Sequence, residues 1–403
     1  MRVLLTDGSG LTARQVANRL AGAGHVVDVL APDPLCLCRF TRHVARVHRV
    51  PSYGAYPIAW LQSALAVYRS GGFDVLFPTQ EQVAVLSLAR DWLRAEGVAT
   101  VVPPFGALAA VQDKVSAAAT ITRLGLPQPP TATDANGWAR FPAFVKEAIG
   151  TASGGVRRVR SPEELRDAMS EKSSVVQAEV EGPLAMCQSV FDCGSLVAFH
   201  ANLRTGEGAN GGASHKLSIE LPEVRRWFRV LGGDLGWHGA LSADVILTHA
   251  GAVFIDLNPR LVEPENAWRS GVDLVGPMMD LALGTHPTDQ SSGRSGVATH
   301  QVLLALLGAA QHGAGRWGVA SELLQSWLKS AAYRHSTEEL TQVVSDPLAA
   351  LPVLLAAVAT LVRPSSWSWF ASGSVASYAL TAAAWQQICK AASSRKWAPT
   401  CDG

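Results

Sequence analysis

The sequence has no excess of charge of either sign. Its 34 lysine and arginine residues oppose 33 aspartate and glutamate residues, and the formal net charge is +1. Because no global field favours nucleic acid or an anionic membrane, we expect no nucleic-acid partner, and a local cluster of cations must hold any anionic ligand. A chain of 403 residues that is 48% hydrophobic and 17% charged is expected to form a globular protein with two or three packed domains.

Cysteine is scarce, and none of the six cysteines is spaced as C-x-x-C, the pattern typical of structural zinc sites and oxidoreductases. The isolated pair Cys36 and Cys38 supplies at most half of a metal site, so we expect reduced thiols. The N-terminal segment lacks the long apolar core and small-residue cleavage site of a signal peptide. These absences predict a cytoplasmic protein.

Long uncharged runs are rare as well. Residues 347–362 form a run without a charged side chain, which ends at Arg363. The run is shorter than the ~20 residues that a spanning helix requires, and Pro352 interrupts it. We therefore expect no membrane span. A buried helix is the favoured interpretation, and a helix resting on a membrane is the alternative.

The first hundred residues show a β-α-β pattern. Apolar runs at 3–5, 26–30 and 75–77 predict strands, and residues 12–23 predict a helix between the first two. Such alternation is typical of a parallel sheet covered by helices, so we expect a Rossmann-like α/β domain over residues 1–100.

A short glycine motif follows the first predicted strand. Gly8 and Gly10 invite a dinucleotide-binding interpretation and hence a nicotinamide-dependent oxidoreductase, with Asp28 or Asp33 as the acid for the ribose. The third glycine of G-x-G-x-x-G is missing, which favours a tight turn that lets the helix pack on the sheet. Under either interpretation the turn lies at the carboxyl end of a strand, where ligands of such sheets bind.

Residues 101–290 show a different pattern. Residues 108–124 predict one helix that ends at Gly125, and the short β-rich runs that follow suit an α+β domain with antiparallel sheets. The expected strands cover 143–146, 175–177, 189–191, 196–199, 245–247 and 253–256. Beyond about residue 290 the chain is rich in alanine and leucine, and we expect a helical region over 291–403.

The clearest chemical signal is a predicted hairpin whose turn lies around 249–251. Because side chains alternate along a strand, Asp256, Asn258 and Arg260 project from one side, and antiparallel pairing can bring Asp244 opposite them. Two carboxylates and an amide oxygen suit Mg²⁺, and the arginine offers a planar fork for a phosphate or carboxylate. Apolar residues between these positions argue against a solvated hairpin with chance charges. We expect Asp244, Asp256 and Asn258 to hold the metal.

This hairpin resembles the magnesium-binding hairpin of the ATP-grasp superfamily. Other segments of residues 1–290 follow in that family's order: a lysine that opens a helix, a second lysine on a strand, a glycine loop and a hinge. The resemblance implies bound ATP and Mg²⁺, with Mn²⁺ as a substitute, and ATP-grasp subdomains at 101–185 and 186–290. It implies these ATP-binding residues: Lys114, Lys146, Gly150, Ser153, Gly154, Gly155, Gln177, Ala178, Glu179, Val180 and Glu181. Lysines suit phosphate oxygens, and glycines let backbone N–H groups approach them.

One feature of the family is missing. ATP-grasp enzymes commonly place a glutamate after the hinge to bind the ribose hydroxyls, and residues 182–188 contain none. Gln188 or Glu181 is the candidate to replace it. The residue after the second lysine is Glu147, where the family often has proline. The missing acid supports an alternative function, a regulatory protein that binds ATP without turnover.

The segment between the hinge and the hairpin, residues 200–216, combines many glycines with cations and hydroxyl groups. We expect a loop that moves over the reacting groups, and a plain surface loop is the alternative. Arg204 is the candidate to stabilise developing charge, supported by Lys216 or His215.

Three acids, together with His215, are candidates for the substrate side. Glu81 follows the strand predicted at 75–77, and Glu263 and Glu265 follow the hairpin, in segments similar to the family's substrate-side elements. Glu263 and Glu265 are positioned to hold an amine. An acid that stabilises the start of a helix is the alternative for each.

Together these residues predict a ligase. A substrate carboxylate attacks the γ-phosphate of ATP to give an acyl phosphate, and an amine then displaces phosphate to form an amide or peptide bond. Arg204, Arg260 and Lys216 are the expected catalytic cations, and the partners are a small carboxylate and a small amine. No G-x-S-x-G nucleophile elbow is present. For the region 291–403 the sequence leaves three alternatives open: it covers the site, forms a homodimer interface or contacts a carrier.

Overall fold

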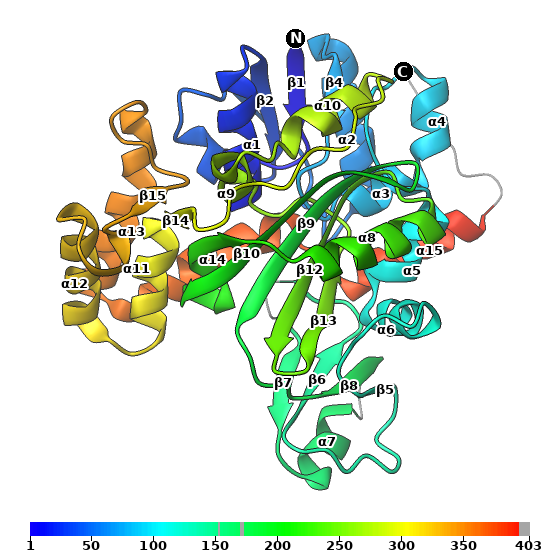
Figure 1. Cartoon of the computed structure of the whole chain (residues 1–403). Coiled ribbons are helices and arrows are strands. Elements are labelled where there is room, and N and C mark those ends of the chain that lie inside the picture. Colours follow the sequence, from blue (N-terminus) through cyan, green and yellow to red (C-terminus); the bar gives the residue numbers. More distant parts are fainter. Residues whose placement is uncertain (152–153, 170–172, 395–403) are drawn as a thin grey trace.

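The computed structural model describes residues 1–151, 154–169 and 173–394. Its N-terminal part is built on a parallel sheet in the order β3-β2-β1-β4 (Figure 1). The strands are β1 (Arg2–Leu5), β2 (Val26–Ala31), β3 (Arg46–Arg49) and β4 (Val75–Phe77). Val3 pairs with Val27 and Val75 in the neighbouring strands, so the parallel sheet predicted from the apolar runs is confirmed.

Helices cover both faces of this sheet. Val3 and Leu5 belong to one apolar core and Leu4 to another, and all three are fully buried. Burial on both faces explains why these strands are continuous apolar runs rather than alternating ones. The helices are α1 (Leu11–Gly22), α2 (Pro57–Gly71), α3 (Val83–Leu88) and α4 (Arg90–Ala95).

Two helices connect this unit to the next, where the sequence predicts one. Asp113 interrupts the pattern because its backbone is extended and its side chain accepts a hydrogen bond from the Ser116 amide. Such a cap begins a new helix, so the expectation of a single helix over 108–124 is wrong. The two helices are α5 (Phe105–Gln112) and α6 (Lys114–Arg123).

A small antiparallel sheet in the order β5-β8-β6-β7 forms the next unit, at the bottom of Figure 1. Leu165 of α7 (Pro162–Met169) packs on Val145 and Val176 of this sheet. The strands are β5 (Thr131–Ala132), β6 (Ala143–Glu147), β7 (Val156–Val159) and β8 (Ser174–Ala178).

A larger sheet has the order β13-β12-β9-β10-β11-β14-β15. Phe228 of α8 (Pro222–Leu235) packs on one face, whereas Val190 and Ala240 join the core of the N-terminal unit from the other. The second face is therefore the one turned toward the N-terminal sheet. The strands are β9 (Leu184–Asp192), β10 (Ser195–Glu207), β11 (Ala213–Ile219), β12 (Gly239–Thr248), β13 (Gly251–Asn258), β14 (Ala298–His300) and β15 (Ser336–Glu338).

The loop expected over residues 200–216 is mostly a strand pair. β10 continues to Glu207 and β11 begins at Ala213, with the short helix η2 (Ala209–Gly211) between them. A Cβ at Gly208 would lie 2.9 Å from the carbonyl oxygen of Leu304. This glycine therefore permits close packing, and the expectation of a mobile loop is wrong for most of the segment.

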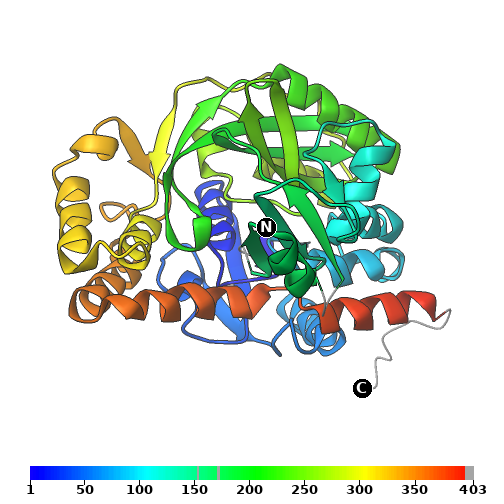
Figure 2. The ribbon, with the colours of Figure 1, turned by 90° about the horizontal axis from the view of Figure 1, so that it is seen from below.

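The C-terminal part is largely helical, as expected, and also adds β14 and β15 to the large sheet. Helices α14 (Trp367–Tyr378) and α15 (Ala382–Ser393) run in line along one side of the molecule (Figure 2). Ala384 and Ile388 of α15 enter the N-terminal core. The remaining elements are η1 (Leu37–Arg39), α9 (Glu265–Ser270), α10 (Val275–Ala282), α11 (Val302–Gln311), α12 (Gly315–Trp327), η3 (Ala331–Tyr333), η4 (Pro347–Ala349), α13 (Ala350–Val362) and η5 (Pro364–Ser366).

The uncharged run at 347–362 forms η4 and α13, but the helix is not buried as expected. Ala356 and Ala357 face inward, whereas one apolar side of the helix is exposed. The exposed residues of α13 are Leu351, Leu354, Leu355, Val358 and Val362. Within the described ranges, no helix is long and apolar enough to cross a membrane.

Candidate functional site

The three expected metal ligands lie on one face of the hairpin formed by β12 and β13. Asp244 and Asp256 are register partners, and Asn258 pairs with Ser242 two residues further along. Directly paired side chains share a face of a sheet, so the three oxygen groups converge. Burial and, to a smaller extent, the neighbouring Asp256 raise the pKa of Asp244 to about 6. A divalent cation with oxygen ligands would relieve this repulsion, so the donor set fits Mg²⁺.

Two lysines from other elements meet this hairpin. Lys114, at the start of α6, places Nζ 3.7 Å from Oδ1 of Asp256. Lys146 on β6 is 8% exposed, and its Nζ donates to Oε1 of Gln177 at 2.8 Å and to the carbonyl oxygen of Ile255 at 2.7 Å. Burial lowers the pKa of Lys146, whereas Asp256 raises it. The structure therefore brings both predicted lysines, Gln177 and the predicted metal ligands together.

A narrow cavity lies between α6, the small sheet and β13. Its lining combines both lysines with apolar side chains, the mixture expected of a nucleotide site. The lining residues on which this rests are Lys114, Ile121, Lys146, Val175, Gln177 and Phe254.

The glycine loop joins β6 to β7 beside Lys114. Nζ of this lysine donates to the carbonyl oxygen of Gly150 at 3.4 Å. The amide of Gly154 donates to the carbonyl oxygen of Thr151, and Gly155 has φ +75°, a conformation that favours glycine. Ser153, also expected to contact phosphate, lies outside the described residues.

The hinge follows β8, and part of it is already engaged within the protein. The amide of Ala178 donates to the carbonyl oxygen of Pro130 at 2.9 Å, and that of Glu179 donates to Pro142 at 3.2 Å. The carboxylate of Glu179 lies 2.7 Å from Arg158. The backbone N–H groups of two of the predicted adenine contacts are therefore engaged within the protein.

Further polar residues occupy the same face of the large sheet. Arg204 pairs with Lys216 across β10 and β11, and it is one of the cations that lower the pKa of Asp244, after Lys146 and Arg260. Its guanidinium donates to the carbonyl oxygen of Gly211 at 2.8 Å. Gln188 is the register partner of Ser242 and donates to the carbonyl oxygen of Glu263 at 3.5 Å. Gln188 therefore lies among the metal-hairpin residues and not at the hinge.

Asn202 lies in this row of residues, and the sequence interpretation gave it no role. It pairs with Met186, which in turn pairs with Asp244. The side chain is 0% exposed, yet neither amide atom has a hydrogen-bond partner within the described part of the chain. Because such groups are costly to bury unsatisfied, Asn202 points to a ligand at this face. The sequence did not predict this because it does not show that Asn202 lies on the same face of the sheet as Asp244.

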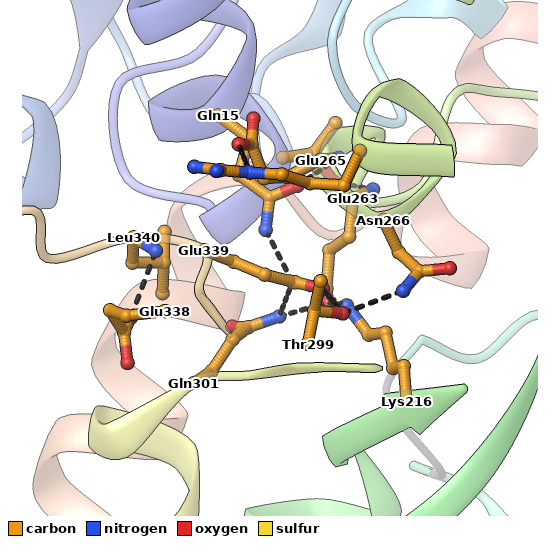
Figure 3. Close-up of polar contacts among 12 residues, drawn as sticks. Gln15, Lys216, Glu263, Glu265, Asn266, Thr299, Gln301, Glu338, Glu339 and Leu340 are labelled. Carbon is orange, nitrogen blue, oxygen red and sulfur yellow. Dashed lines mark hydrogen bonds and ion pairs between the residues drawn. The ribbon is translucent and has the colours of Figure 1, made fainter. Parts of the chain in front are cut away.

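Lys216 is held between two carboxylates (Figure 3). Nζ lies 2.5 Å from Oε2 of Glu263 and 2.7 Å from Oε2 of Glu339. Burial would lower the pKa of Lys216, but the two carboxylates outweigh it and raise the pKa above its ordinary value. Gln15 and Thr299 also donate to Glu339, at 2.9 and 2.6 Å. The sequence did not predict a role for Glu339, because only the fold brings the C-terminal region to Lys216. The two adjacent acids at 338–339, in a region rich in alanine, are the sequence feature that could have indicated a polar site.

Two of the expected substrate residues are placed elsewhere. His215 lies on the opposite face of β11 from Lys216, and its ring packs on Tyr333 at 4.7 Å. Glu265 pairs with Arg269 at 2.7 Å, one turn further along α9. The structure does not bring either side chain to the metal hairpin. Glu263 does lie there, with φ +44°, a strained conformation for a residue with a side chain.

Glu81 and Arg260 join the N-terminal sheet to the hairpin. Nε of Arg260 lies 2.9 Å from Oε1 of Glu81, and Tyr53 donates to the carbonyl oxygen of Glu81 at 2.8 Å. Tyr378 of α14 is close to both: burial raises its pKa, and the Arg260 guanidinium lowers it. The C-terminal region therefore covers this side of the site.

The glycine turn after β1 is packed as a structural turn. A Cβ at Gly10 would lie 2.2 Å from Nε2 of Gln80, and Ser374 of α14 donates to the carbonyl oxygen of Ser9 at 2.6 Å. Asp28, the candidate ribose acid, lies 2.8 Å from His48. This geometry supports the tight turn rather than the dinucleotide site.

No protein-family model matches the chain, and no relative is found among curated proteins. Solved structures do share its fold. N5-carboxyaminoimidazole ribonucleotide synthetase (PurK), in an ADP complex, has a TM-score of 0.59 at 15% identity over 78% of this chain and 85% of its own. The biotin carboxylase domain of Hydrogenobacter thermophilus 2-oxoglutarate carboxylase, with MgADP and bicarbonate, has a TM-score of 0.58 at 17% identity over 74% and 73%. Campylobacter jejuni biotin carboxylase has a TM-score of 0.58 at 15% identity over 74% of each chain. The predicted ATP-grasp fold is confirmed.

Proposed function

We propose that the protein is an ATP- and magnesium-dependent ligase that activates a carboxylate as an acyl phosphate and couples it to an amine. The observation that carries this proposal is the convergence of Lys114 and Lys146 on Asp256 and its register partner Asp244. Two lysines that can bind phosphate oxygens and the carboxylates that can bind a metal therefore lie beside the same cavity. The MgADP and bicarbonate bound to the similar biotin carboxylase domain support this assignment.

Each group has a task in the proposed reaction. Asp244, Asp256 and Asn258 hold the metal, which neutralises charge on the phosphates when bound. Lys146 and Lys114 bind phosphate oxygens, and the loop of Gly150, Gly154 and Gly155 covers them. The adenine edge meets the hinge after Gln177.

The acid and the amine bind between the hairpin and the N-terminal sheet. Arg204 and Arg260 neutralise the carboxylate and the transferring phosphoryl group, since phosphoryl transfer depends mostly on positioning and charge. Lys216 acts as a positioning residue through Glu263, which is also the candidate to bind the amine. We propose subdomain boundaries near residues 100, 185 and 290, a cytoplasmic location, and a homodimer that light scattering would detect.

A hydroxylamine assay tests the proposal. Carboxylic acids are screened for acid-dependent ADP release with hydroxylamine present, and a hydroxamate product identifies an acyl phosphate. Asp256→Asn should abolish the signal, whereas Asp280→Asn, an exposed acid on α10, should not. ADP release that does not depend on any acid would overturn the ligase assignment. Thermal stabilisation by ATP with Mg²⁺ but not by NAD would exclude the oxidoreductase alternative.

A further inference from the structure

A cluster of three metal-ligating side chains lies at the opposite end of the large sheet from the hairpin carboxylates. Asp192 ends β9, Cys193 forms the following turn, and His238 directly precedes β12. The carboxylate, sulfur and imidazole ligand atoms all lie within 4.8 Å of one another. Cys193 and His238 are 45 positions apart, so no short sequence motif joins them.

The distances within the cluster suit a shared cation. His238 Nδ1 lies 3.7 Å from Cys193 Sγ and 3.6 Å from Asp192 Oδ1. Tetrahedral zinc, with Zn–S of about 2.3 Å and Zn–N of about 2.0 Å, places its ligand atoms roughly 3.3–3.6 Å apart. The two distances from His238 are close to these values, and Asp192 and Cys193 present their ligand atoms within 4.8 Å of each other.

The nitrogen of His238 that faces the cluster already has a partner. The Cys193 amide donates to Nδ1 of His238 at 3.3 Å, so a metal ion would replace this N–H at the lone pair of the nitrogen. A bound cation would displace the thiol proton and be held by the thiolate.

The surroundings orient these ligands. His286 Nδ1 lies 2.6 Å from the second carboxylate oxygen of Asp192, the type of contact that fixes a metal-binding carboxylate. Cys193 has φ +44°, in the left-handed region that favours glycine. Strained residues of this kind concentrate at functional sites, and here the turn directs the sulfur toward His238.

We propose that Asp192, Cys193 and His238 bind a zinc ion, with a water molecule as the fourth ligand. Mixed sulfur, nitrogen and oxygen ligands select a borderline-soft cation rather than Mg²⁺. Asp192 is six residues beyond Met186, the partner of Asp244, so about 20 Å of strand separates the two sites. The ion would fasten the β9–β10 turn to the start of β12, the strand that carries Asp244. This proposal is independent of the ligase reaction.

Cobalt titration of the metal-free, full-length protein tests the site. Co²⁺ should bind in one equivalent and give a thiolate-to-cobalt charge-transfer band, which Zn²⁺ then abolishes by displacement. Cys193→Ser should lose the band. His286→Ala should weaken cobalt binding about ten- to a hundredfold, as loss of an outer partner does. Zn²⁺ should raise the melting temperature of the wild type but not of Cys193→Ser.

Matched variants separate this site from other ligands. Cys389→Ser removes a partly buried thiol on α15, and Asp256→Asn removes a carboxylate of the magnesium hairpin. Both should keep the full band. Cys193 lies on an exposed turn, so its serine variant should fold even where His238→Ala does not. Absence of a thiolate band in the wild type, or a band that survives Cys193→Ser, would overturn the proposal.

Discussion

The ammonium of Lys216 lies 2.7 Å from the carboxylate of Glu339, a residue 123 positions further along the chain. Glu263 lies on its other side, at 2.5 Å. The three groups come from β11, from the segment after β13 and from the residue that follows β15. A single buried cation thus ties the metal hairpin to the C-terminal region.

Removal of the Lys216 charge should be costly because it leaves two carboxylates close together. We expect Lys216→Met to lower the free energy of unfolding by about 3–5 kcal/mol, the cost of breaking a buried ion pair. Adding Glu339→Gln removes one of the uncompensated charges and should restore part of the loss. Denaturant unfolding of both single variants and the double variant measures the coupling. Strictly additive losses would contradict the contact, and Glu223→Gln, an exposed acid on α8, is the control.

Asn202 and Asn266 should respond oppositely to the same substitution. Asn202→Leu replaces a buried amide without partners, so stability should be unchanged or higher while ATP turnover falls. The Asn266 amide nitrogen donates to Thr299 at 2.7 Å, and its Oδ1 accepts from Nε2 of His200 at 2.8 Å. Asn266→Leu should therefore lower the free energy of unfolding by about 1–3 kcal/mol for each partner left unsatisfied. Thermal unfolding and ADP release measure both; a destabilised but fully active Asn202→Leu would contradict the assignment.

Lys146→Met should weaken ATP binding by about ten- to a hundredfold, or ~1.4–2.8 kcal/mol. The buried ammonium is a point charge beside the nucleotide cavity, and methionine keeps its length without the charge. Methionine also leaves the acceptors on Gln177 and Ile255 without their donor, so the melting temperature should fall modestly. Calorimetric titration with ATP and Mg²⁺ measures the affinity, with Lys390→Met on exposed α15 as control. Equal affinity in the two variants would remove Lys146 from the site.

Magnesium affinity should fall as the pH falls through about 6. The pKa of Asp244 is raised to about 6 by burial and by Asp256, so below this pH the carboxylate holds a proton that the cation must displace. Well below the pKa, the affinity should drop about tenfold per pH unit. Titration without nucleotide avoids the ionisation of phosphate. Asp280→Asn should keep the same profile, and a pH-independent affinity in the wild type would show that Asp244 is not a ligand.

Several strands could be predicted from the sequence because short apolar patterns mark them. The apolar runs at β1, β2 and β4 are buried on both faces, and this burial is what makes them recognisable. The placement of the hairpin carboxylates could be predicted for a related reason. Asp256 and Asn258 are two residues apart on one strand, and a short turn fixes the partner strand within a few residues, so the position of Asp244 opposite Asp256 follows from the pairing.

Other predictions were wrong because the same residue type serves a different purpose once the chain is packed. Glycines in residues 200–216 were interpreted as a mobile loop, but Gly208 is required by the close approach of Leu304. Asp113 was read within a helix, although its side chain caps the next one. His215 and Lys216 are adjacent, and strand alternation sends them to opposite faces.

The sequence by itself determined strands β1, β2 and β4 and the hairpin, because these depend on side-chain periodicity over a few residues. The tertiary structure alone decided which distant groups share a site: Glu339 beside Lys216, Tyr378 beside Arg260, and Cys193 beside His238. Such contacts arise from the packing of whole elements against one another. No local pattern encodes them, since burial and charge compensation act between surfaces that meet only in the folded chain.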